Sequence, residues 1–206
     1  MAHRDFFTDA AKKRAALAVK HVEAQTSAEI VVAVRQLSGS YRDAHLVGAG
    51  LLGFIVLLLL LFLPQSFEVG GMPLDVAIGS AVGYALVSRS ELFRRLFTGK
   101  RARRLRVESA AKAAFVDFGI SRTTGRTGVL VYVSVLERCA SLVGDTALQT
   151  DALKKVLEAT ESALSTAIGR GDFEGFISEL EKLGAALAPA LPRAADDVNE
   201  LPDEVR

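Results

Sequence analysis

The sequence is poor in the residues that most often reveal a protein's chemistry. Its 206 residues include one cysteine, three histidines and no tryptophan. With Cys139 alone, an intramolecular disulfide is excluded, as is a zinc or iron–sulfur site built from several cysteines of one chain. The formal net charge is only +1. The composition therefore gives no general signal for binding nucleic acid or another polyanion.

The familiar catalytic signatures are missing as well. The chain has no H-E-x-x-H, Walker A or G-x-S-x-G motif. Its histidines, His3, His21 and His45, lack metal-ligand spacing, and we interpret them as surface or interfacial residues. Residues 48–53 match the dinucleotide fingerprint G-x-G-x-x-G. A polar linker precedes them and a uniformly apolar segment follows. We therefore assign these glycines to a membrane helix.

The dominant feature is a long apolar segment, Leu46 to Leu63, with 18 residues and no charge. As a helix it would be roughly 27 Å long, close to the ~30 Å hydrocarbon core of a bilayer. A weaker apolar segment follows at about residues 73–88, with Asp75 near its start. Gly79 and Gly83 form a Gly-x-x-x-Gly step that favours close helix packing. We predict a two-helix transmembrane hairpin with spans at about 46–63 and 73–88.

Charge predicts the orientation of this hairpin. Basic residues precede it, eight more lie between Arg89 and Arg106, and the connecting loop contains Glu68 but no lysine or arginine. The positive-inside rule then predicts a multi-pass inner-membrane protein with both termini cytoplasmic. No cleavable signal peptide is expected, because the first apolar segment begins after 45 mixed residues. The candidate contacts with anionic lipid headgroups are Arg94, Arg95, Lys100, Arg101, Arg103 and Arg104.

Two interpretations of this basic segment stay open. It either contacts anionic lipid directly, or it is a topology signal followed by a solvated helix face, which we favour. No nucleic-acid-binding motif accompanies the charge, so we expect no nucleic-acid partner. The expected partners are the lipid bilayer and a membrane protein.

Periodicity predicts a mixed α/β domain around the hairpin. We expect helices over residues 8–25, 101–118, 151–168 and 173–187, and strands over residues 28–34, 128–134 and 139–143. The predicted organisation is a first domain part at residues 1–42, a transmembrane hairpin at 43–90, a second domain part at 91–189 and a disordered acidic tail at 190–206.

Two acidic residues are candidates for chemistry. Asp145 follows a predicted strand, and Asp117 lies near the end of a predicted helix. In parallel sheets, functional sites gather at the carboxyl ends of strands. Either carboxylate would suit a divalent cation, Ca²⁺ or Mg²⁺, or would act on a substrate. The alternative is a turn-capping aspartate, which is common in proteins.

Three segments resemble the TPM domain family. Residues 26–32 (TSAEIVV) are similar to its first strand, residues 126–145 to its central hairpin, and residues 171–176 (GDFEGF) to a late conserved turn. The resemblance covers about residues 6–36 and 101–188 and implies a three-layer α/β/α sandwich. Asp145 aligns with the aspartate of the family's A-D-R-G-I motif, but Thr146 and Ala147 replace the basic residue and the glycine that follow it.

The resemblance implies several functions. Members of the family are linked to photosystem repair, to receptor modulation and to bacterial membrane proteins, and some are credited with weak acid-phosphatase activity and divalent-metal binding. Family layouts commonly place a signal peptide first and a single span last, whereas here the apolar segments interrupt the domain. We expect an accessory or interaction module of a membrane complex, with a metal-assisted phosphatase that uses Asp145 and Asp117 as the alternative.

Overall fold

The computed structural model describes residues 8–64, 68–193 and 200–201, and it confirms a mixed α/β class that is mostly helical around a small sheet. The chain forms two compact units, one of residues 1–38 with 104–206 and one of residues 39–103. The helices and strands, in chain order, are α1 (Asp9–Glu23), β1 (Glu29–Arg35), α2 (Arg42–Phe62), α3 (Met72–Arg89), α4 (Glu91–Leu96), α5 (Lys100–Asp117), β2 (Gly128–Ser134), β3 (Cys139–Gly144), α6 (Asp151–Arg170) and α7 (Phe173–Leu187).

The sheet has the order β1-β2-β3. Strand β1 pairs in parallel with β2, from Glu29 opposite Gly128 to Arg35 opposite Ser134, and β3 returns antiparallel to β2. All of β2 and the first five residues of β1 are buried. Continuous apolar strands of this kind suit a sheet covered on both faces.

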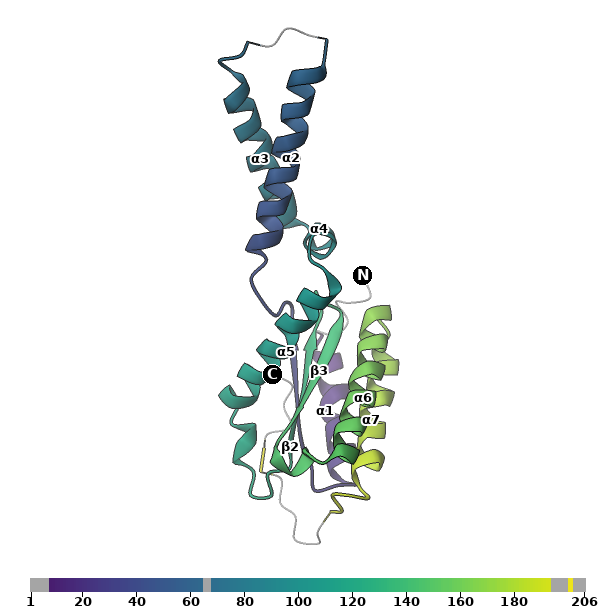
Figure 1. Cartoon of the computed structure of the whole chain (residues 1–206). Coiled ribbons are helices and arrows are strands. Elements are labelled where there is room, and N and C mark those ends of the chain that lie inside the picture. Colours follow the sequence, from purple (N-terminus) through teal and green to yellow (C-terminus); the bar gives the residue numbers. More distant parts are fainter. Residues whose placement is uncertain (1–7, 65–67, 194–199, 202–206) are drawn as a thin grey trace. The chain divides into compact units, whose positions relative to one another are not determined.

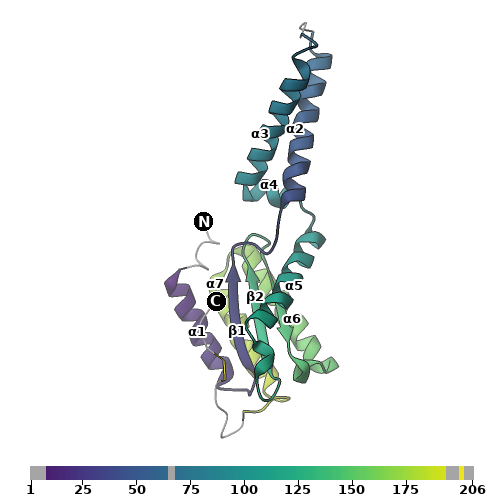
Figure 2. The same cartoon turned by 90° about the vertical axis from the view of Figure 1, so that its left-hand side faces the viewer.

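Helices pack against both faces of the sheet. Helices α1, α6 and α7 cover one face, where Val19, Ile168 and Leu180 are buried against strand side chains such as Val131. Helix α5 covers the other face through Val107 and neighbouring alanines (Figures 1 and 2). The apolar sides predicted for these helices from their periodicity are therefore the sides that build the two cores.

Local signals in the sequence explain where several helices begin and end. The side chains of Thr8, Thr150 and Asp172 accept hydrogen bonds from the first turns of α1, α6 and α7. Gly119 and Gly171 adopt positive φ values of 67° and 72°, which glycine reaches without strain, and they follow α5 and α6.

In the second unit, α2 and α3 lie side by side as a helical hairpin (Figure 1). Their contact needs small residues. A Cβ atom at Gly79 would lie 2.6 Å from Cγ2 of Val56, and one at Gly83 would collide with the carbonyl oxygen of Gly48. The close packing predicted from the Gly-x-x-x-Gly step is confirmed.

Within the described residues, α2 is the one helix long and apolar enough to cross a membrane. It has 21 residues, about 31 Å at 1.5 Å per residue, and it begins four residues before the predicted span. Helix α3 has 18 residues with Asp75 in its first turn. The hairpin is therefore observed, but a second membrane span is not shown.

Helix α4 was not foreseen, because its residues were assigned to a basic segment. In the predicted tail, Pro192 pairs with Thr26, and the backbone N–H of Leu201 donates to Oε2 of Glu29 at 3.3 Å. The disorder predicted for residues 194–199 and 202–206 lies outside the described residues.

Candidate functional site

Asp145 lies at the end of β3 and is nearly buried, with 7% of its surface exposed. Its Oδ1 accepts a hydrogen bond from the N–H of Thr146 at 2.7 Å, which is the turn-capping role considered above. Its Oδ2 is buried, has no hydrogen-bond partner among the described residues, and lies 3.8 Å from Nη1 of Arg126. One oxygen of the carboxylate, Oδ1, therefore caps the turn, and the other, Oδ2, lies near the guanidinium of Arg126.

Glu29 joins Asp145 at the same end of the sheet. Both flank Gly128, since Glu29 lies opposite Gly128 in the β1–β2 register and the N–H of Asp145 donates to the carbonyl oxygen of Gly128 at 2.9 Å. This is the end where the parallel strands begin. The rule that functional sites gather at the carboxyl ends of parallel strands does not apply to Asp145. The strand before it, β3, runs antiparallel to its neighbour.

Asp117 is the last residue of α5 and is exposed. Among residues 8–64, 68–193 and 200–201, no three histidine, cysteine, aspartate or glutamate side chains gather where they would hold a metal ion. Asp117, Asp145 and Glu29 therefore do not form a three-carboxylate centre. The geometry gives Ca²⁺ or Mg²⁺ no ready ligand set at these residues.

The carboxyl ends of β1 and β2 hold a buried polar cluster that the sequence analysis did not find. Ser134 donates a short hydrogen bond to Oε2 of Glu137, and Oε1 of Glu137 accepts from the N–H of Ser38 at 3.0 Å. The hydroxyl of Ser38 lies 2.5 Å from that of Ser134. These contacts fix the end of the β1 segment, just before the chain leaves the sheet domain.

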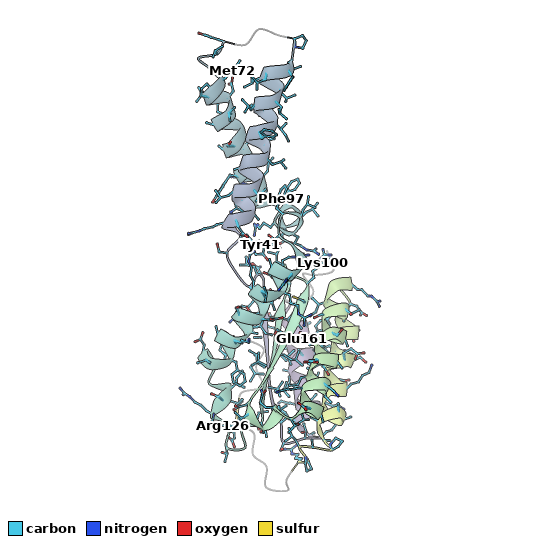
Figure 3. All side chains as sticks on the ribbon, viewed as in Figure 1. Tyr41, Met72, Phe97, Lys100, Arg126 and Glu161 are labelled. Carbon is cyan, nitrogen blue, oxygen red and sulfur yellow. The ribbon has the colours of Figure 1, made fainter. Side chains whose placement is uncertain are left out.

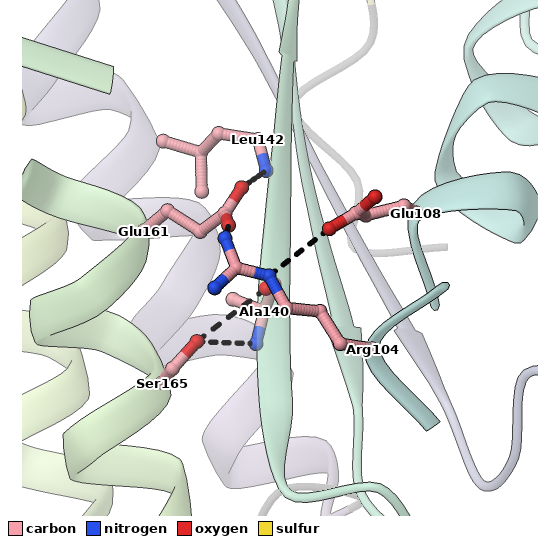
Figure 4. Close-up of polar contacts among 6 residues, drawn as sticks. All are labelled: Arg104, Glu108, Ala140, Leu142, Glu161 and Ser165. Carbon is pink, nitrogen blue, oxygen red and sulfur yellow. Dashed lines mark hydrogen bonds and ion pairs between the residues drawn. The ribbon is translucent and has the colours of Figure 1, made fainter. Parts of the chain in front are cut away.

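The outer edge of β3 is closed by side chains (Figure 4). The N–H of Leu142 donates to Oε2 of Glu161 at 2.9 Å, and the N–H of Ala140 donates to the hydroxyl of Ser165 at 3.0 Å. Exposed edge strands invite pairing with other chains, and α6 blocks this one. Glu161 and Ser165 are polar positions within the apolar side of α6, which is the sequence signal that was missed.

Arg104 connects α5 to this edge. Its guanidinium bonds Oε1 of Glu108 at 3.0 Å and Oε1 of Glu161 at 2.9 Å. The hydrogen bond with Glu108 and the charge of Glu161 raise the pKa of Arg104 above its usual value. The assignment of Arg104 as a lipid contact stays a prediction, but its guanidinium is already bonded to the carboxylates of Glu108 and Glu161.

A groove of about 310 Å³ runs along β3 between α5 and α6. Its charged lining is mixed, and residues 141–144 of β3 also line it. Figure 3 shows Glu161 along the sheet and Arg126 toward one end of it. The charged residues are Arg104, Lys112 and Lys154 on the cationic side and Glu108, Glu158 and Glu161 on the anionic side.

The basic segment shows more than one role for its residues. Arg94 is half-buried and donates to the carbonyl oxygens of Val87 at 3.4 Å and Ser88 at 2.6 Å, so it caps the end of α3. Lys100 and Arg101 are exposed, while Arg95 and Arg103 are half-buried. The assignment of these residues to the membrane surface stays a prediction.

No family model matches the chain, and no curated protein matches it significantly. Among solved structures, the fold is similar to the NMR structure of the BA42 protein from the psychrophilic bacterium Bizionia argentinensis. The TM-score is 0.55, the sequence identity is 19%, and the match covers 96% of this chain and 92% of that one. At this identity the likeness concerns the fold.

Proposed function

We propose that this protein is an integral inner-membrane protein with a cytoplasmic TPM-like domain that serves as an accessory or interaction module of a membrane complex. The α/β/α arrangement and the fold likeness to BA42 support a TPM-like domain. The motif resemblance at residues 26–32 and 126–145 supports it independently.

One observation carries the membrane part of the proposal. In the apolar window of α2, only 11% of the residues are buried. Leu46, Phe54 and Phe62 are 65%, 57% and 80% exposed. A core helix of a soluble protein would bury such side chains, because monomeric soluble proteins rarely expose contiguous apolar surface of this extent. Lipid is the solvent that suits this surface.

Topology has a direct test. A reporter fused after Arg206 should report a cytoplasmic location, and one inserted between α2 and α3 should report the opposite side. Both reporters on one side would mean that the hairpin does not span the membrane. A periplasmic result for the Arg206 fusion would refute the predicted orientation.

The interaction part is supported by the groove along β3. A lining with three cations and three acids suits the mixed charges of another protein's surface better than a phosphate ester. We expect a detergent extract to yield a reproducible membrane partner in cross-linked pull-downs. Lys154→Glu, within the groove, should lose that partner, and Lys155→Glu, next to it but outside, should retain it. Absence of a reproducible partner would contradict the module hypothesis.

A phosphatase is the second candidate, supported by the buried, unbonded Oδ2 of Asp145 beside Arg126. The purified chain would be tested on a phosphoester with and without Mg²⁺ or Ca²⁺. Asp145→Asn should abolish any genuine activity, whereas Asp117→Asn should leave it unchanged, because Asp117 is exposed and outside this pair. Activity that survives Asp145→Asn would eliminate the idea.

A further inference from the structure

Helix α4 has two different sides. Residues 92, 93, 96 and 97 are all apolar, and helical spacing gathers them on one side, opposite Glu91, Arg94 and Arg95. The rings of Phe93 and Phe97 stack with centroids 6.3 Å apart. Leu92 and Leu96 are each 69% exposed. An apolar side opposite a charged side is the pattern of helices that lie at the boundary between lipid and water.

Arg94 fixes where α4 stands. Its bonds to the carbonyl oxygens of Val87 and Ser88 satisfy acceptors at the end of α3 and hold the turn between the two helices. The hydroxyl of Ser90 also accepts from the N–H of Phe93 at 3.4 Å. Helix α4 is therefore attached to the hairpin through side-chain contacts in addition to the chain itself.

Between α4 and the hairpin lies an apolar groove of about 130 Å³. Helix α2 contributes Gly48 and Leu52, and α3 contributes Gly83 and Val87. The phenylalanine of α4 and the one that caps its end, Phe93 and Phe97, complete the lining. The volume is below the roughly 300–1,000 Å³ of a pocket for a drug-sized ligand. The groove thus has room for a segment of a slender apolar chain rather than for a compact molecule.

The groove lies at the hairpin end that adjoins the basic segment. Gly48 is near the start of α2 and Val87 is near the end of α3. Figure 3 shows Phe97 at the opposite end of this unit from Met72. Residues 89–103 contain six cationic side chains, of which Arg89, Lys100 and Arg101 are exposed, and a single acid, Glu91. Apolar groove and positive charge together match an acyl chain that ends in an anionic headgroup.

We propose that α4 lies at the lipid–water boundary and that the groove between α4 and the α2–α3 hairpin holds part of one acyl chain of an anionic phospholipid. This inference rests on the proposed membrane location. It also deepens that proposal, because it names a bound lipid rather than the bilayer in general.

The membrane location is tested first. The chain has no tryptophan, so a single introduced tryptophan reports alone. Phe54→Trp, exposed in the middle of α2 and outside the groove, should be quenched in vesicles of brominated phospholipid. Val116→Trp, 70% exposed on α5, should not be quenched. An unquenched Phe54→Trp would overturn the proposed function itself.

The groove is tested separately by native mass spectrometry of the full chain in detergent with equal amounts of phosphatidylglycerol and phosphatidylcholine. We expect one retained phosphatidylglycerol per chain. Leu86→Phe, which fills the groove, should reduce retention at least fivefold. Leu74→Phe, on α3 but outside the groove, should not. If Leu86→Phe lowers the helix content, Ile55→Phe in the same lining replaces it.

Three results would overturn this inference while leaving the membrane location intact. They are no retained lipid in the wild type, equal retention of both lipids, and retention unchanged in the folded groove-filling variant. Each of these results counts against the bound lipid when Phe54→Trp is quenched, because quenching shows that the hairpin is in the membrane.

Discussion

Gly128 is the first residue of β2 and lies opposite Glu29 at one end of the β1–β2 ladder. A Cβ atom there would lie 2.5 Å from the carbonyl oxygen of Ile120 and 2.6 Å from its Cγ2. Ile120 is fully buried, so the clash has no easy relief. The glycine was seen in the sequence only as the first residue of a strand. Glycine is needed here because the backbone packs against a short 3₁₀ turn, Ile120–Arg122. No local pattern predicted this tertiary contact.

Gly128→Ala should therefore lower the free energy of unfolding by about 1–3 kcal/mol, as overpacking of a core does. Gly169→Ala is the matched control. Gly169 lies inside α6 with nothing near its missing Cβ, so alanine should stabilise by about 1 kcal/mol through helix propensity. Urea unfolding followed by circular dichroism measures both. Equal effects would show that the Ile120 contact is unimportant.

Gly83 sets the distance between the hairpin helices. A Cβ atom at this position would meet the backbone of Gly48, whereas one at Gly50 would meet nothing within 4 Å. We expect Gly83→Val to lower the thermal stability of the hairpin in detergent and Gly50→Ala to leave it unchanged or raised. Helix content against temperature is the measurement. A hairpin that tolerates Gly83→Val would have a looser contact than the structure indicates.

At the scale of elements, the edge of β3 depends on α6. Glu161→Ala removes the acceptor of the Leu142 N–H. We expect it to lower the free energy of unfolding by about 1–3 kcal/mol and to give the protein a new tendency to self-associate. The ion pair with the exposed Arg104 should account for less than about 1 kcal/mol of this. Glu161→Gln keeps an acceptor, so it should lower the free energy of unfolding by less. Glu158→Ala, at an exposed position, should hardly change it.

Unfolding and analytical ultracentrifugation of these variants would separate the two effects. A monomeric, fully stable Glu161→Ala would show that the edge needs no cap. A loss of stability without association would mean that other groups already protect β3.

Most elements were predictable because their signals are local. Strand β2 is an apolar run between a polar turn and a second turn, and its predicted residues 128–134 are those observed. Helices α6 and α7 have caps and apolar spacing that the sequence displays directly. Helix α4 was missed because its six residues carry two arginines, and charge masked the three apolar residues at 92, 93 and 96.

The candidate sites were less predictable than the elements. Asp145 was found from its place after a strand, but its burial and its neighbour Arg126 depend on the sheet register. The Ser38–Ser134–Glu137 cluster joins residues about 100 positions apart, and only the parallel pairing of β1 with β2 brings them together. The two strands lie about 100 residues apart in the sequence, so no local turn connects them or marks them as partners.

At the scale of the whole molecule, both apolar cores draw only on residues 1–38 and 104–206. Replacing residues 39–103 with a flexible Gly/Ser linker should therefore give a water-soluble domain that unfolds cooperatively. Circular dichroism and amide NMR dispersion would test this. Aggregation or a poorly dispersed spectrum would show that the domain needs its membrane segment to fold.

The parallel pairing of β1 with β2 also dictates an order of events during synthesis. Strand β1 leaves the ribosome about 100 residues before its partner, since Glu29 must wait for Gly128. At roughly 5–20 residues per second, that wait is on the order of 5–20 s. The apolar hairpin emerges within this interval. Under the proposed function it would therefore meet the membrane while the sheet is still incomplete, and the domain would close only after its anchor had been delivered.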